Sequence, residues 1–201
     1  FMHKRMVKMT KRDYFNYENP KFYALRDPMR EVMKAFLDAE RYFAAIKEVV
    51  WGRYAMPYLA DAIHSLEHKQ PPRIDQFSDA MRQEGLEIEY PGTAELAEPL
   101  ESLDEVFRVC VELTDSIDRR LQMFIDVADK RRGANGTAPS EMQGKFPALA
   151  RQAEQLQIDN STDRTKLLES WAMWGNQPSA SSFDKWVKSR YDLPDSGEDD
   201  D

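Results

Sequence analysis

Two histidines and a glutamate lie within five residues of one another, and together they could bind a metal ion. His64, Glu67 and His68 belong to the string HSLEH. A helix would place the two histidines one turn apart on the same face. Imidazole and carboxylate groups are common ligands of divalent transition metals. The string also fits the H-x-x-E-H pattern of inverted zincins, but no third ligand motif follows it. The alternative interpretation is a solvated helix face.

Three further acidic residues are candidates for the same chemistry. Glu40 is the strongest, because its neighbours at helical spacing are apolar and a buried charge is costly unless it is paired or bound to metal. The alternative is a carboxylate at the edge of the apolar stripe, paired with Arg41 or Lys47. Asp118 and Glu154 are weaker candidates. The predicted metal ligands are therefore Glu40, His64, Glu67, His68, Asp118 and Glu154.

The sequence contains no complete catalytic motif, so whether the protein is an enzyme stays open. Cys110, the only cysteine, lies in an apolar helical stretch and is predicted to be a core residue rather than a nucleophile. A phosphate-binding loop, a dinucleotide fingerprint and a serine nucleophile elbow are all missing. A single cysteine cannot form a disulfide within the chain, which favours a reducing, cytoplasmic compartment.

The composition predicts one folded domain with charged ends. The 201 residues are 41% hydrophobic, which is enough for a packed core. No stretch approaches the eighteen apolar residues of a membrane-spanning helix, so no membrane partner is expected. The net charge of -8 argues against a protein that binds nucleic acid over its whole surface. Five basic residues nevertheless precede the first acid, Asp13, and acidic residues close the chain.

The elements that must position these residues are predicted to be helices, since apolar residues recur at steps of three and four. Pro28 suits the first turn of the first helix. Pro71 and Pro72 should break or kink the second. Ser102 and Glu105 form a capping-box pattern. The predicted helices cover residues 28–51, 56–85, 101–131, 140–158, 162–175 and 180–191, and residues 86–100 form a long connection.

The chain divides into an extended N-terminal arm (1–27), a helical bundle (28–192) and a disordered acidic tail (193–201). The arm is rich in aromatic residues, and the C-terminal segment contains three tryptophans. Aromatic side chains are favoured at protein interfaces. We therefore expect a homo-oligomer or a subunit of a larger complex. The tryptophans concerned are Trp171, Trp174 and Trp186.

The order of these elements resembles the ferritin-like superfamily, in which two helical hairpins are joined by one long crossover. The strings AERYFAAI at 39–46 and IHSLEHKQ at 63–70 are similar to ferritin and Dps-type proteins. The resemblance implies an all-α, ferritin-like four-helix bundle with extra C-terminal helices. It also implies a di-iron site, for which Glu40 and His68 match. Ser65 stands where the second-helix Glu is expected, and no histidine follows residue 140.

Two functions follow from this comparison. In the first, the bundle has lost a full di-iron site and acts as a structural or interaction subunit. In the alternative, it binds iron or another divalent metal for iron oxidation or storage. Dps-type proteins also carry basic N-terminal tails that bind DNA, which makes nucleic acid a further candidate partner through the first twelve residues. The net charge and the acidic tail oppose this last interpretation.

Overall fold

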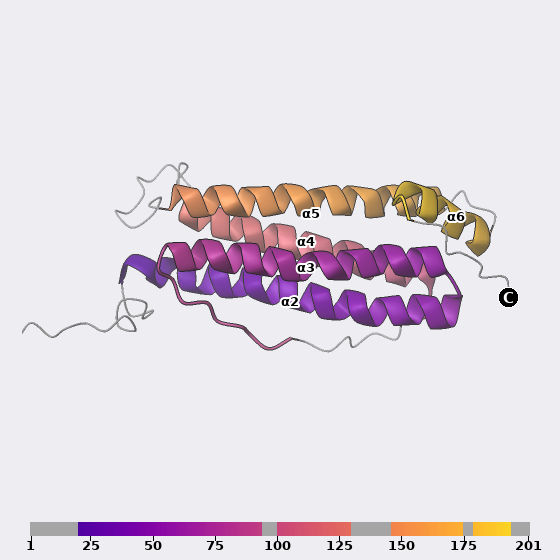
Figure 1. Cartoon of the computed structure of the whole chain (residues 1–201), viewed down its shortest axis with the longest axis horizontal. Helices are drawn as coiled ribbons and strands as arrows, with labels where there is room; N and C mark the ends of the chain where they lie inside the picture. Colours follow the sequence, from indigo (N-terminus) through magenta and orange to yellow (C-terminus); the bar gives the residue numbers. More distant parts are fainter. Residues whose placement is uncertain (1–19, 94–99, 130–145, 175–178, 194–201) are drawn as a thin grey trace, which may run out of the picture.

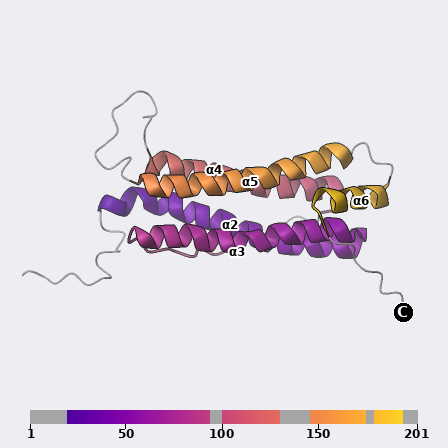
Figure 2. The ribbon, with the colours of Figure 1, turned by 45° about the horizontal axis from the view of Figure 1, so that its top comes forward.

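The structure, a computed structural model, describes residues 20–93, 100–129, 146–174 and 179–193. Every regular element in these ranges is an α-helix, which confirms the predicted all-α class. Four long helices lie side by side, and a short one lies at one end of the bundle (Figures 1 and 2). None of the described helices is long and apolar enough to cross a membrane. The helices are α2 (Pro20–Tyr54), α3 (Pro57–Gln83), α4 (Leu103–Ala128), α5 (Pro147–Trp174) and α6 (Ala180–Arg190).

The long helices form two antiparallel hairpins. The first joins α2 to α3 through a turn at residues 55–56, where Ala55 has a φ of 50°. The second pairs α4 with α5, and the Asn160 side chain donates to the Thr114 carbonyl at 2.7 Å. Arg164, one turn after Asn160 on α5, makes an ion pair of 2.8 Å with Asp115 of α4. Each hairpin buries the apolar face of one helix against its partner.

The described residues after α3, 84–93, run back along α2 (Figure 1), and α3 and α4 point in the same direction. Near one end of α2, Arg53 donates to the Leu100 carbonyl at 2.9 Å. Near the other end, Arg120 of α4 pairs with Glu31 at 3.5 Å, so α4 is antiparallel to α2 as α3 is. Arg26 holds the segment to α2 through Glu89 at 3.4 Å. Of the predicted connection over 86–100, residues 86–93 and Leu100 lie along α2, and residues 94–99 lie outside the described residues.

Aromatic side chains join the helices at two levels of the core. The Phe77 and Phe124 rings meet edge to face at 5.1 Å. Phe107 meets Phe183 in the same geometry at 5.3 Å, which ties α6 to α4. Two of the tryptophans predicted to mark an interface are partly buried and pack against this second group. Trp171 lies 6.3 Å from Phe107, and Trp186 stacks on Phe183 at 6.1 Å.

The first helix begins at Pro20 rather than at Pro28. Leu25 is buried and extends the apolar stripe of Met29 and Val32 by one more turn. Pro28 costs one backbone hydrogen bond inside the helix. The prediction of an extended arm is therefore wrong for residues 20–27, because tertiary burial outweighs the proline signal. The rest of the arm, including its basic residues, and the tail beyond residue 193 lie outside the described residues.

The second helix is not broken at its double proline. Pro71 and Pro72 both lie inside α3 and both are exposed, so their rings face away from the neighbouring helices. The two prolines remove the helical hydrogen bonds to the carbonyls of Glu67 and His68. Buried side chains on either side of the pair, such as Leu66 and Ile74, hold the helix through this point.

Two other predicted boundaries are also wrong. One helix, α5, replaces the two predicted over 140–158 and 162–175. Asn160 lies in the predicted gap, but it is fully buried and its amide hydrogen-bonds α4, which favours continuing the helix. The other wrong boundary is the end of α4. This helix starts as predicted, with Ser102 Oγ accepting a hydrogen bond from Glu105 N at 3.2 Å. It ends at Ala128, before the predicted basic residues.

The first turn of α3 is capped by a residue from α6. Met56 precedes the helix and offers no side-chain acceptor. Asp184 lies 125 positions after Leu59 and accepts a hydrogen bond of 2.8 Å from Leu59 N. Burial raises the pKa of Asp184, although the N–H groups of Leu59 and Tyr58 work against the rise. The free N–H groups of a helix start need such an acceptor, so α6 completes α3.

Replacing Asp184 with alanine should lower the free energy of unfolding by about 1 kcal/mol, because α3 loses its cap. Asp184→Asn keeps an oxygen acceptor and should cost less. Urea unfolding followed by circular dichroism measures both variants. Equal losses for the two substitutions would show that the hydrogen bond to Leu59 is not what Asp184 contributes.

Candidate metal centre

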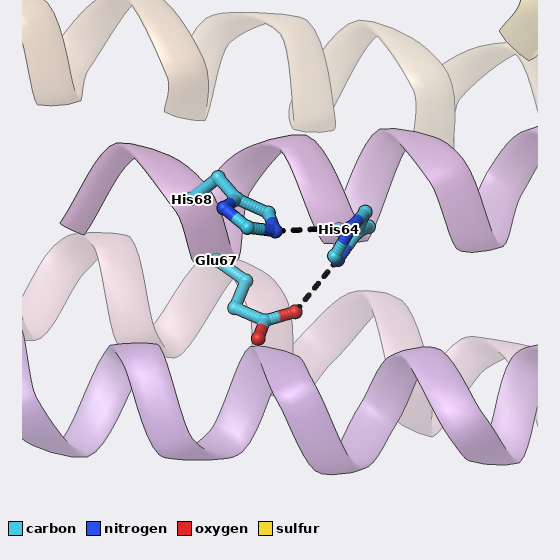
Figure 3. A group of neighbouring side chains, drawn as sticks. All are labelled: His64, Glu67 and His68. Atoms are coloured by element: carbon cyan, nitrogen blue, oxygen red, sulfur yellow. Dashed lines mark hydrogen bonds and ion pairs between the residues drawn. The ribbon is translucent and has the colours of Figure 1, made fainter. Parts of the chain in front are cut away.

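One face of α3 brings His64, Glu67 and His68 together, and each offers a potential ligand atom within 4.8 Å of the others (Figure 3). His64 Nδ1 lies 2.8 Å from Glu67 Oε2. His68 Nε2 lies 3.0 Å from His64 Nε2. The two rings are nearly perpendicular, at 87°, with centroids 4.2 Å apart. We call these three residues the histidine cluster.

The local helix explains this arrangement. Residues three and four apart share a face, so positions 64, 67 and 68 project together. Ile63 and Leu66 are buried on the core side of the same turns, which leaves the histidine cluster at the surface. The His64 side chain is 43% exposed, whereas that of Glu67 is 20% exposed. Solvent can therefore reach the imidazoles, and the carboxylate lies deeper, between α3 and α2.

A lysine from α2 approaches the carboxylate side of the cluster. Lys47 Nζ lies 3.2 Å from Glu67 Oε2 and 3.4 Å from His64 Nδ1. Partial burial works to raise the pKa of Glu67, but hydrogen bonds from His64 and Lys47 outweigh it and leave that pKa lowered. Partial burial likewise works to lower the pKa of Lys47, yet bonding to Glu67 leaves it raised. Glu67 is therefore an ionised carboxylate with a cation already beside it.

The other three predicted ligands do not join the histidine cluster. Glu40 is half-buried on α2, and Glu154 is exposed on α5. Asp118 on α4 pairs with Arg164 at 2.6 Å and accepts from Asn160 at 3.0 Å. The ligand atoms brought together in the described part of the chain are those of the three α3 residues.

The interior contains a polar group that sequence reasoning missed. Arg73 of α3 and Asp163 of α5 are 8% and 3% exposed, so they are buried like core residues. Arg73 Nη2 lies 2.6 Å from Asp163 Oδ2, and Lys69 Nζ lies 2.7 Å from Asp163 Oδ1. Gln70 and Asn160 are buried next to this pair along the same helices. Gln70 and Arg73 interrupt the apolar stripe of α3, and this interruption could have indicated a buried polar group. It gives no such indication when the helix is predicted to break at Pro71 and Pro72.

Removing one partner of this pair should be far more harmful than removing both. Asp163→Ala leaves the Arg73 guanidinium buried without its carboxylate and should lower the free energy of unfolding by about 3–5 kcal/mol. The double variant Arg73→Met/Asp163→Leu replaces charge with apolar volume and should recover most of that loss. Urea denaturation of the three proteins tests this. A double variant as unstable as Asp163→Ala would contradict it.

Cys110 is confirmed as a core residue. It is 1% exposed, and burial raises the pKa of its thiol to about 12. The thiolate, which is the nucleophilic form, is therefore scarce at neutral pH. Cys110 is a free cysteine.

A thiol reagent should consequently label the native protein slowly and the urea-unfolded protein at once, with one equivalent per chain because Cys110 is the only cysteine. The absorbance of released thionitrobenzoate gives both rates. Rapid labelling of the native state would show that the thiol is accessible and would contradict its place in the core.

Two comparisons with known proteins bear on this chain. No protein-family model matches it, and neither does any curated protein sequence. The two polar groups that stand out in the described residues are the histidine cluster on the surface of α3 and the buried ion pair between α3 and α5.

Proposed function

We propose that this chain is a ferritin-like bundle without a complete di-iron site and that it serves as a structural or interaction subunit of a larger assembly. The topology supports the first part. Two antiparallel hairpins are joined by a long connection, and the second and third long helices run in the same direction (Figure 1). Ferritin-like bundles have one such crossover.

The observation that carries the proposal is the Arg73–Asp163 ion pair. Lys47 pairs with Glu67, and α2 and α3 are antiparallel, so Glu40 lies about level with Arg73. The resemblance matches Glu40 to the first-helix ligand, so this is the level of that ligand. His68, which it matches to the second-helix histidine, is exposed on the surface of α3 instead. The pair therefore occupies the interior where Glu40 would need its partners.

The interior residues have the family's spacing but the wrong chemistry. Di-iron bundles place Glu-x-x-His motifs on two helices, with the side chains projecting inward. Here the buried residues at that spacing are Gln70 and Arg73 on α3, and Asn160 and Asp163 on α5. A guanidinium is a permanent cation without a lone pair, so it cannot be a ligand and it repels a metal ion. The residues of this layer do not fit a di-iron centre.

The alternative function, iron oxidation or storage, draws on the histidine cluster. That cluster contributes two imidazoles and one carboxylate already paired with Lys47. Iron sites of the ferritin type rely on several carboxylates, which are harder donors. The cluster is therefore a better argument for a different metal than for iron.

The proposal predicts an assembly that does not oxidise iron. Light scattering should give a mass that is a multiple of the 23.4 kDa chain, or a mixed complex with a partner protein. Aerobic oxidation of Fe(II), followed by ultraviolet absorbance, should proceed at the buffer rate with the purified chain and with the matched variant Glu40→Ala.

Each half of the proposal can fail separately. A monomer at high concentration that captures no partner would remove the assembly. Iron oxidation that is faster than buffer and lost in Glu40→Ala would restore the di-iron interpretation.

A further inference from the structure

We infer that His64 and His68 bind one borderline divalent cation of the Zn²⁺, Ni²⁺ or Cu²⁺ class through their Nε2 atoms, with Glu67 orienting His64 rather than binding the ion. This site lies on the surface of α3 and is separate from the interior layer, so it does not rest on the proposed function.

The distance between the two nitrogens fits a shared ion. Nε2 of His64 and Nε2 of His68 are 3.0 Å apart. If an ion lay 2.0–2.1 Å from each nitrogen, the usual Zn–N distance, the N–ion–N angle would be about 94°. That is close to the right angle between adjacent ligands of an octahedral ion, and a small ring rotation would open it toward tetrahedral geometry. No change in the backbone is needed.

Glu67 sets which nitrogen of His64 is free. Its carboxylate oxygen lies 2.8 Å from Nδ1, so Nδ1 carries the proton and donates to it. The lone pair of a neutral imidazole is then on Nε2, which faces His68 (Figure 3). Metal-binding histidines commonly donate their other N–H to a carboxylate, and this contact fixes the ring and makes it a better ligand.

Lys47 determines on which side of His64 the ion can bind. Its ammonium lies within 3.4 Å of Nδ1 and 3.2 Å of Glu67. A second cation bound to the Glu67 carboxylate would meet this charge directly, whereas one at the Nε2 atoms lies on the opposite edge of the ring. The donors that remain are two imidazole nitrogens, which suit Zn²⁺, Ni²⁺ and Cu²⁺ better than Mg²⁺ or Ca²⁺.

The exposure of both rings makes the site open. His64 is 43% exposed and His68 is exposed, so an ion can enter without any helix moving. Two protein ligands leave further coordination positions for water or for another molecule. Such an open position is what a catalytic or bridging ion has and what a closed structural zinc site lacks.

The test uses Zn²⁺ and the full chain without an affinity tag, with binding measured by calorimetry or by competition with a chromophoric chelator. The chain should bind one Zn²⁺. His64→Ala and His68→Ala should each abolish this binding. His3→Ala is the matched control, because it removes the remaining histidine of the sequence and should leave the affinity unchanged. Circular dichroism checks that every variant is folded.

Two further variants separate the assigned roles. Glu67→Gln should weaken Zn²⁺ binding by about 10–100-fold without abolishing it, as expected for a group that orients a ligand. Lys47→Met should strengthen binding, since it removes a nearby positive charge. Zn²⁺ binding that survives either histidine substitution would overturn the site. Complete loss in Glu67→Gln, or weaker binding in Lys47→Met, would overturn the assigned geometry.

Discussion

The buried ion pair between Arg73 and Asp163 constrains the rest of the bundle. Two charges removed from water cost several kcal/mol each, and the cost is offset only when they meet with good geometry and further hydrogen bonds. Asp163 therefore also needs Lys69. Sliding α5 by one helical turn, about 5.4 Å, would separate the Arg73 guanidinium from the Asp163 carboxylate and leave each buried without its opposite charge. The pair thus selects one register of α3 against α5, whereas an apolar core alone would tolerate several.

One helix, α3, carries both polar groups with functional content, and it directs them to opposite sides. Gln70 and Arg73 point into the bundle, and His64 and His68 lie on its surface. The inward group includes the Arg73 guanidinium, which is permanently positive. The outward group contributes two imidazole nitrogens that lie 3.0 Å apart. The contrast follows from residue type, since a guanidinium competes with metal ions and an imidazole binds them. The buried ion pair and the surface imidazoles therefore lie on different faces of this helix.

The sequence predicts these groups to different degrees because their contacts differ in range. The proximity of His64 to His68 follows from helical spacing, so it needs no tertiary information. The Arg73–Asp163 pair spans 90 positions, and no local pattern reveals it. The sequence suggests Lys47 as a partner of Glu40, but in the structure Lys47 bonds Glu67 across the α2–α3 hairpin. The start of α2 and the continuity of α5 were missed for the same reason: Leu25 and Asn160 are helical because of what buries them.

The cap that Asp184 supplies to α3 has a consequence for how the protein forms during synthesis. A ribosome adds about 5–20 residues per second, so the 125 positions between Leu59 and Asp184 take roughly 6–25 s to translate. During that interval the rest of α3 is translated, yet its first turn lacks its carboxylate acceptor. The exposed N–H groups there must rely on water until α6 arrives. Helix α6, which is translated well after α3, thus completes it, and a chain that stops short of α6 leaves the start of α3 without this cap.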